Sequence, residues 1–306
     1  MYRFIATLLA LTPAIALHAG PPKVATDIPP VFSLVARVMD GVGTPDLILQ
    51  PGMSPHDYSM RPSEAQMLEQ ADLVFWIGHD LTPSLEKPLD VLAASAVVIE
   101  LLDVDGIKTH EFRDNAVFDE HDHDHEDHHD HGPTDPHAWL DPENAKVWIA
   151  VIAEALSEQD PENTATYQGN ALAALTEIDA ASTEIEEMLE PVRNRNFVVF
   201  HDAYQYFEKR FKIASTGSIA AGDAVDPSAA RIAEVSERVR ALDVDCVFSE
   251  PQFDPGIIAA LDASTTLNTA VIDPLGASLP VNSSLYTSLL ISIADKMSAC
   301  LSDRSG

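Results

Sequence analysis

Positively charged residues are scarce in this sequence. Its 306 residues include 18 Lys and Arg against 49 Asp and Glu, which gives a formal net charge of −31. Binding to nucleic acid phosphates needs a basic face, so this balance argues against nucleic acid as a partner, and equally against anionic membrane surfaces. A protein this acidic is suited to meeting cations. Because 46% of the residues are hydrophobic, the chain can form packed cores and is not disordered as a whole.

The sequence also lacks a run of about 20 apolar residues, the length that spans a bilayer. The apolar run at 4–17 is too short and follows a single positive charge, Arg3. Small residues then offer cleavage sites after Ala16 and after Ala19, so we expect residues 1–19 to be a cleaved secretory signal peptide. The alternative is a buried N-terminal strand or helix. No cysteine lies near the cleavage sites, which argues against a bacterial lipid anchor, and we expect a soluble periplasmic protein.

Cysteine is rare as well, with Cys246 and Cys300 as the two examples. In an exported chain an isolated pair is most simply a disulfide. The two positions are 54 residues apart, a loop whose closure stabilises the fold by about 4 kcal/mol in the chain-entropy model. Two buried free thiols are the alternative.

Short apolar runs alternate with helical patterns in both halves of the chain. This alternation is typical of α/β folds with mostly parallel sheets, and the length suggests two domains of roughly 150 residues each. We expect an N-terminal lobe at 20–158, a linking helix at 159–193 and a C-terminal lobe at 194–306. A continuous helix over 161–190 would be about 45 Å long and could join the lobes as a stiff strut. Other expected strands are 23–26, 46–49, 72–77, 96–101, 197–200, 244–248 and 270–272, and other expected helices are 29–40, 63–70, 81–93, 142–156, 203–210, 226–242, 257–262 and 285–301.

Residues 119–131 form an unbroken run of seven acidic residues and six histidines. A segment of this composition cannot bury a core, so we expect a solvated, disordered loop. Its histidines are His121, His123, His125, His128, His129 and His131.

Three other histidines lie where ligand-binding residues are expected in an α/β fold. His56 follows the strand at 46–49 through a turn, His201 directly follows the strand at 197–200, and His137 stands just before a helix start. Ligands of open α/β sheets bind beyond the carboxyl ends of strands, and Asp273 occupies such a place after 270–272. Three imidazoles with a carboxylate or a water make a four-ligand zinc site. Taken singly, a loop histidine is more often a cap or surface residue, and an Asp before Pro is more often an N-cap or turn residue.

Three further side chains are of types that can act in catalysis or metal binding, but we expect a structural or surface role for each. Glu250 is either a general base or a salt-bridge partner, and we favour the structural role. We expect His79 and His110 to be surface residues.

Several ordered motifs resemble the ZnuA family, the periplasmic zinc-binding proteins of bacterial ABC importers within the metal-binding class of solute-binding proteins. The resemblance runs from about Lys23 to Leu301. The motifs are PHDYSMRPS at 55–63, the His-acid run, PHAWLDP at 136–142, VFHDAYQYF at 199–207 and FSEPQF at 248–253.

The resemblance implies a role for each candidate residue. His56, His137 and His201 match the family's three zinc-binding histidines, and Asp273 matches the carboxylate that completes the site in related proteins. Some members carry a Glu just before the first histidine; here this position is Pro55, so Asp273 or water must fill the fourth place. The cysteine pair matches a disulfide of some members, and the family architecture is two α/β lobes joined by a long helix, with the metal in the cleft between them.

The charged run also matches a charged loop of the family. Imidazoles and carboxylates on a flexible tether offer many weak zinc sites, which would raise the metal concentration near the cleft. A solvated spacer is the alternative.

These observations predict a non-enzymatic protein that captures Zn²⁺ and delivers it to the permease and ATPase of an ABC importer, with a periplasmic zinc chaperone as a further partner. We expect a monomer. An exported zinc hydrolase would use the same three histidines with Glu250 as base, but no His-Glu-x-x-His signature is present. A manganese carrier is the third possibility. Related manganese binders place a carboxylate where His201 stands, and three imidazoles suit Zn²⁺ better than Mn²⁺.

Overall fold

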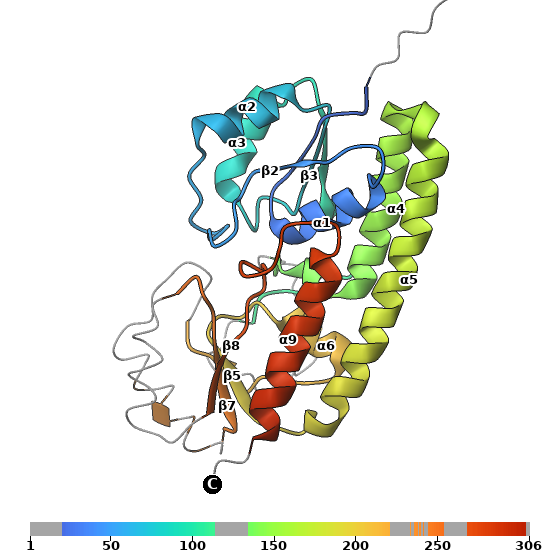
Figure 1. Cartoon of the computed structure of the whole chain (residues 1–306). Coiled ribbons are helices and arrows are strands. Elements are labelled where there is room, and N and C mark those ends of the chain that lie inside the picture. Colours follow the sequence, from blue (N-terminus) through green and yellow to red (C-terminus); the bar gives the residue numbers. More distant parts are fainter. Residues whose placement is uncertain are drawn as a thin grey trace, which may run out of the picture.

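The computed structural model of the chain describes residues 20–113, 134–220, 244–253 and 268–303, together with 233, 236–237, 239 and 241. The predicted signal peptide at 1–19, the His-acid run at 119–131, the predicted helix at 257–262 and most of the one at 226–242 lie outside the described residues. Within the described part, two four-stranded parallel sheets stand at opposite ends of the molecule (Figure 1).

The two sheets share one strand order, in which the first strand of each half lies between the second and the third. The first sheet runs β2-β1-β3-β4 and the second runs β6-β5-β7-β8. Neighbouring strands are parallel throughout, so helices or other long connections must cross between them. The strands are β1 (Val24–Thr26), β2 (Asp46–Leu47), β3 (Leu73–Trp76), β4 (Val97–Glu100), β5 (Phe197–Val199), β6 (Gly217–Ser218), β7 (Cys246–Ser249) and β8 (Asn268–Val271). This repetition confirms the expected pair of similar α/β lobes.

Helices surround both sheets and connect them. They are α1 (Pro29–Val38), α2 (Pro62–Gln70), α3 (Pro83–Leu92), α4 (Pro142–Gln159), α5 (Thr164–Leu189), α6 (Gln205–Phe211) and α9 (Leu285–Ser302). Most start at or next to a proline, whose fixed φ suits the first helical turn. None of the described helices is both long and apolar enough to cross a membrane.

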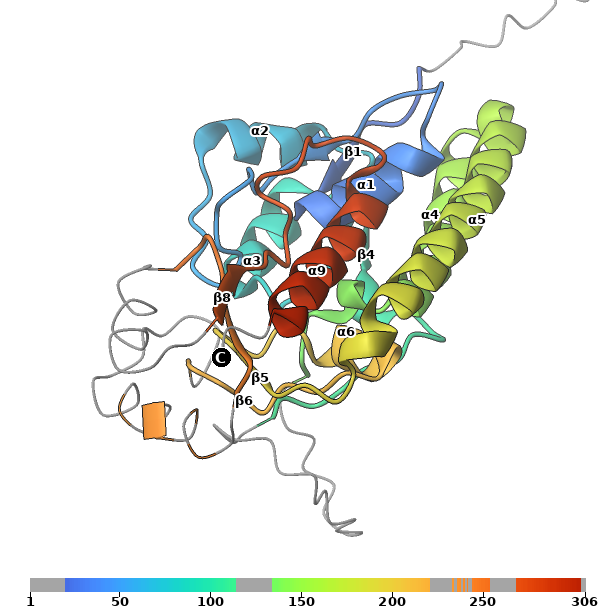
Figure 2. The same ribbon diagram turned by 60° about the horizontal axis from the view of Figure 1, so that its bottom comes forward.

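Helix α5 runs alongside both lobes and packs against α1, α4, α6 and α9. Figure 2 shows α4 and α5 side by side from a second direction. The helix expected over 161–190 is shorter at both ends, because residues 161–163 and 190–192 form 3₁₀ turns. At the first of these turns the Asp160 carboxylate accepts hydrogen bonds from Asn163 Nδ2 at 2.7 Å and Tyr167 Oη at 2.9 Å. These side-chain bonds fix a tight turn where the sequence pattern suggested continuous helix.

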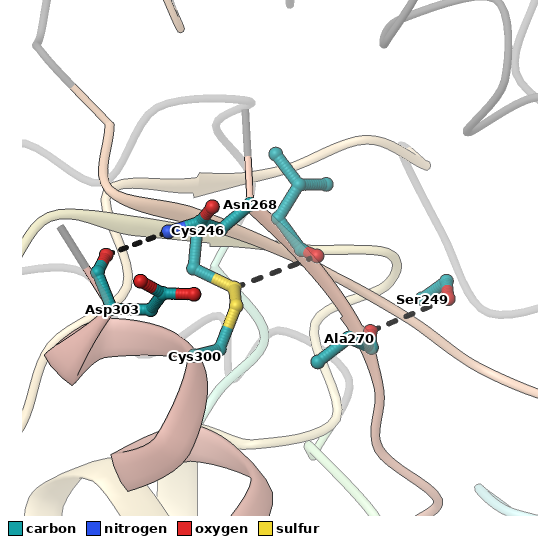
Figure 3. Close-up of a disulfide and its surroundings, with 7 residues drawn as sticks. Cys246, Ser249, Asn268, Ala270, Cys300 and Asp303 are labelled. Atoms are coloured by element: carbon teal, nitrogen blue, oxygen red, sulfur yellow. Dashed lines mark hydrogen bonds between the residues drawn. A yellow bond between two sulfur atoms is a disulfide. The ribbon is translucent and has the colours of Figure 1, made fainter. Parts of the chain in front are cut away.

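A disulfide joins Cys246 at the start of β7 to Cys300 near the end of α9, with their Cα atoms 6.1 Å apart (Figure 3). The predicted pairing is therefore confirmed. Asn268 Nδ2 donates to Asp303 O at 2.7 Å beside it, so the C-terminal end of α9 is attached to two strands of the second sheet.

Candidate metal centre

The three predicted histidines converge. Each offers a ring nitrogen, and these three atoms all lie within 4.8 Å of one another. His56 comes from the loop after β2, His137 precedes the 3₁₀ turn at 138–140, and His201 follows β5. Their ring centroids are 5.2–6.0 Å apart. Both lobes therefore contribute to one cluster, at the carboxyl ends of β2 and β5, as the position of the histidines after strands predicts.

A buried carboxylate orients each of two rings. Asp135 Oδ1 lies 2.8 Å from His137 Nδ1, and Glu250 Oε1 lies 2.7 Å from His201 Nδ1. A carboxylate accepts hydrogen bonds, so each Nδ1 carries the proton and each Nε2 presents its lone pair. The two Nε2 atoms lie 3.4 Å apart. Carboxylates behind histidines in this manner fix the tautomer of metal ligands.

Burial shifts the pKa values of the ionisable side chains at the site. Desolvation raises the pKa of Asp135 to about 7 and raises the pKa of Glu250 above its usual value. The pKa of His56 is lowered to about 2, first by burial and then by the neighbouring imidazoles of His137 and His201. His56 is therefore neutral at physiological pH and keeps a lone pair for a metal ion.

Helix α6 holds the Asp135–His137 segment in place. Gln205 Nε2 donates to Asp135 Oδ2 at 3.2 Å, and Tyr206 Oη donates to the Asp135 carbonyl at 2.7 Å. The Asp135 carboxylate also accepts the His137 backbone N–H at 3.0 Å. Because α6 begins four residues after His201, one short helix positions two of the three histidines.

Asp273, predicted as the fourth ligand, is not a member of the histidine group among the described residues. Its Oδ1 accepts hydrogen bonds from Leu275 N at 2.9 Å and Gln252 Nε2 at 3.0 Å, and its Oδ2 accepts from Ala277 N. In this arrangement the carboxylate caps the turn that follows Pro274. Its role as a metal ligand stays a prediction.

A cavity of about 20 Å³ adjoins the cluster, enough for roughly one water molecule or an ion. Trp139 Nε1 donates to Pro274 O at 2.8 Å on its wall, which ties the His137 segment to the second lobe. The lining residues are Ser54, Pro55, His56, His137, Trp139, His201, Glu250, Gln252, Phe253, Pro274 and Leu275.

The sequence of the whole chain matches known proteins. The family model described as "ZnuA: Zinc-uptake complex component A periplasmic" matches residues 24–300. The chain belongs to the ZnuA family. A high-affinity zinc uptake system protein ZnuA from Brucella suis is 40% identical over 305 residues, covering 91% of each chain. The relative of the same name from Paracoccus denitrificans is 38% identical and covers 95% of each chain.

Solved structures share the fold of this ZnuA-family chain. A crystal structure of ZnuA has a TM-score of 0.77 at 23% identity, covering 92% of this chain and 99% of that one. The periplasmic zinc-binding protein TroA from Treponema pallidum has a TM-score of 0.79 at 18% identity, covering 93% and 100%. At these identities the likeness concerns the fold alone.

Sequence reasoning missed the part that Asp135 plays and left the part of Glu250 open. Asp135 stands two residues before His137, a spacing that lets one carboxylate reach both the backbone and the ring of that histidine. Glu250 proves to be a buried partner of His201, in agreement with the structural role that we favoured.

The remaining described histidines stand apart from the cluster. His79 has a 62% exposed side chain and contacts Asp80 and Glu100, as expected for a surface residue. His110 is half-buried, and its ring packs on Tyr206 at a centroid distance of 4.7 Å, so it is less exposed than predicted. The six histidines of the His-acid run lie outside the described residues. A β-bridge pairs Glu111 with Thr134 on either side of the segment that contains them.

Proposed function

We propose that this protein binds Zn²⁺ at His56, His137 and His201 and delivers it to the permease of an ABC-type zinc importer. One observation carries the proposal: two imidazoles, each backed by a buried carboxylate, direct their Nε2 atoms toward each other at 3.4 Å, with a third imidazole beside them. A divalent cation among these nitrogens would bind the lone pairs and neutralise charge on the buried carboxylates behind them.

The donor set favours zinc. Three imidazole nitrogens suit Zn²⁺, whereas Mn²⁺ prefers carboxylate and water oxygens. The carboxylates of Asp135 and Glu250 face the outer Nδ1 atoms of the ligands, so they support the imidazoles and leave the nitrogen donors to face the metal.

The small cavity supports transport over catalysis. A space of about 20 Å³ has no room for an organic substrate beside a metal ion. Glu250, the base that a zinc hydrolase would require, is only 4% exposed and is bound to His201. An ion that is held by protein side chains and released whole is cargo, which requires no chemistry beyond coordination.

Family membership supports the cellular context of the proposal. The relatives are named high-affinity zinc uptake system proteins, so we assign the permease and its ATPase as partners, with a periplasmic zinc chaperone as a further one. We assign the chain to the periplasm as a monomer after removal of residues 1–19. We also propose that the chain is divided into lobes at 20–158 and 194–306, which 159–193 joins. Residues 119–131 are proposed to gather metal ions.

Calorimetric titration of the three single variants His56→Ala, His137→Ala and His201→Ala tests the assignment. Each variant is made in a background without residues 119–131, so that loose sites do not contribute heat. We expect zinc affinity to fall at least tenfold in each, because each loses a direct metal–ligand bond. His79→Ala is the matched control, since its exposed ring contacts Asp80 and Glu100. Wild-type affinity in two of the three cluster variants would refute the site.

A further inference from the structure

Gln252, at the metal cavity, has a side-chain oxygen whose hydrogen-bonding capacity is not met by the described residues. It lies two residues after Glu250, the partner of His201, and is among the residues that line the cavity. Its Oε1 atom is buried and accepts no hydrogen bond from the described residues. A buried amide oxygen in this condition costs free energy unless a donor reaches it.

The orientation of this amide is fixed by chemistry. The Asp273 carboxylate accepts hydrogen bonds, and Gln252 Nε2 donates to its Oδ1 at 3.0 Å. Turning the amide over would place two acceptor oxygens against each other. Asp273 is itself held by the backbone N–H groups of Leu275 and Ala277. The chain of contacts from this turn to Asp273 to Gln252 therefore fixes the amide with Oε1 as an unsatisfied acceptor, on a residue that lines the cavity.

We propose that Gln252 is a positioning residue for the metal site: its Oε1 accepts a hydrogen bond from a water molecule that serves as the fourth zinc ligand, and Asp273 acts through Gln252 instead of binding the metal. The inference rests on the proposed zinc-binding function. A metal-bound water donates hydrogen bonds and needs an acceptor. Gln252 Oε1 supplies one. With the ion placed among the three imidazole nitrogens, the adjoining cavity of about 20 Å³ has room for one such water.

This assignment agrees with the hydrogen bonds that the Asp273 carboxylate already accepts. Its oxygens already accept three hydrogen bonds, and moving one oxygen onto a metal would disturb a turn and release the amide. With three imidazoles and a water as ligands, no ligand carries a charge. The negative charge that compensates the zinc ion then comes from Asp135 and Glu250, which lie behind the imidazoles.

Two kinds of Asp273 variant separate the positioning role from a ligand role. Asp273→Asn keeps an Oδ1 that can accept from Leu275 N and Gln252 Nε2 but loses the acceptor for Ala277 N, because Nδ2 takes the place of Oδ2. Asp273→Ala removes every acceptor and frees the Gln252 amide. We expect Gln252→Leu and Asp273→Ala each to weaken zinc binding about 3- to 10-fold, the range for one lost hydrogen bond. Asp273→Asn should weaken zinc binding less than Asp273→Ala does, because its Oδ1 still accepts from Gln252 Nε2. The double variant Gln252→Leu/Asp273→Ala should bind no more weakly than the weaker single variant, since both changes break one chain of contacts.

The measurement is competitive titration of the full chain with a zinc indicator, with unfolding of the metal-free proteins followed in parallel. A loss in Asp273→Asn as large as that in Asp273→Ala while the metal-free variants unfold as the wild type does, or an undiminished effect of Asp273→Ala in the Gln252→Leu background, would make Asp273 a direct ligand and overturn the inference. Wild-type affinity in Gln252→Leu would overturn it too, and this variant leaves the Asp273 turn intact if Asp273→Ala proves unstable. Failure of the zinc-binding function has a different signature, because the histidine variants would then also bind as the wild type does.

Discussion

The Nε2 atoms of His137 and His201 lie 3.4 Å apart, and a buried carboxylate on the opposite nitrogen holds each ring in that position. With both Nδ1 atoms protonated, the facing nitrogens are two acceptors and repel each other. The fold thus keeps an unfavourable contact, which a bound cation would convert into two coordinate bonds. Asp135 and Glu250, each 4% exposed or less, provide the restraint that makes this possible.

Removing the charge of either supporting carboxylate should weaken zinc binding. Asp135→Asn and Glu250→Gln keep a hydrogen-bond acceptor but lower the basicity of the imidazole in front of it, so we expect a loss of about 10- to 100-fold, as for other partners of metal-bound histidines. Titration with a zinc indicator measures it. Glu100→Gln serves as control, because Glu100 contacts the exposed His79 outside the cluster. Unchanged affinity in both cluster variants would show that the carboxylates do not tune the ligands.

The stability of the metal-free protein should carry a pH signature of His56. Its pKa in the folded state is about 2 against an ordinary 6.5, so the unfolded chain binds a proton more readily below about pH 6.5. The contribution of His56 to stability is complete above that pH and is lost as the pH falls toward 2, by up to about 1.4 kcal/mol per pH unit. Asp135 acts in the opposite sense, since its raised pKa of about 7 favours the folded state at low pH and this benefit is lost as the pH rises from about 4 to 7.

His56→Ala removes the first contribution and leaves the second. Between pH 4.5 and 6.5 the variant should lose stability with rising pH more steeply than the wild type. Urea unfolding of both metal-free proteins at several pH values measures the two slopes. Parallel slopes would mean that His56 is accessible to protons in the folded state.

Positions after strands could be predicted from the sequence, and packing between distant segments could not. His56 and His201 follow apolar runs that become β2 and β5, and the carboxyl ends of parallel strands meet the ligand site, so their convergence with His137 was foreseeable. That Glu250 would face His201 depends on the pairing of β5 with β7, and no local pattern records that. Asp273 shows the same division: its place after a strand predicts a ligand, which stays a prediction, while its hydrogen bonds with Leu275 and Ala277 across the following turn depend on packing that the strand pattern does not record.

Breaking the disulfide should affect stability far more than metal binding. Cys246 and Cys300 enclose a 54-residue separation, so the Cys246→Ser/Cys300→Ser variant should lose about 4 kcal/mol of unfolding free energy. The bond attaches the C-terminal end of α9 to the start of β7 (Figure 3), whereas Glu250 follows the other end of that strand. We therefore expect zinc affinity within about threefold of the wild type under conditions where the variant is folded. Chemical denaturation and indicator titration of the same preparation test both parts. A large loss of affinity in the folded variant would show that the disulfide also shapes the site.

Deleting residues 119–131 should change the stoichiometry of zinc binding and leave the tight site in place. The run carries six imidazoles and seven acidic residues without a single apolar one, a composition from which we expect weak, heterogeneous sites. The β-bridge between Glu111 and Thr134 lies outside the deletion and still joins the flanking chain. Equilibrium dialysis should give one tightly bound ion in the deletion variant and additional weak ones in the full chain. Equal numbers in both would show that the run is a spacer.

Metal preference should shift when an oxygen donor replaces one imidazole. His201→Glu adds a carboxylate, which favours Mn²⁺ over Zn²⁺, but it also places that carboxylate beside Glu250, whose Oε1 lies 2.7 Å from His201 Nδ1. Two buried carboxylates at such a distance would share a proton and mask the effect. The informative variant is therefore His201→Glu combined with Glu250→Gln, with Glu250→Gln alone as its matched control. We expect the ratio of manganese to zinc affinity to rise at least tenfold over the control, because one neutral nitrogen donor is lost and one negative oxygen donor is gained. Competitive titration of both metals against one indicator measures this ratio. If the double variant still discriminates against Mn²⁺ as strongly as the control, the spacing that the two lobes impose on the ligands, and not the donor type, determines selectivity.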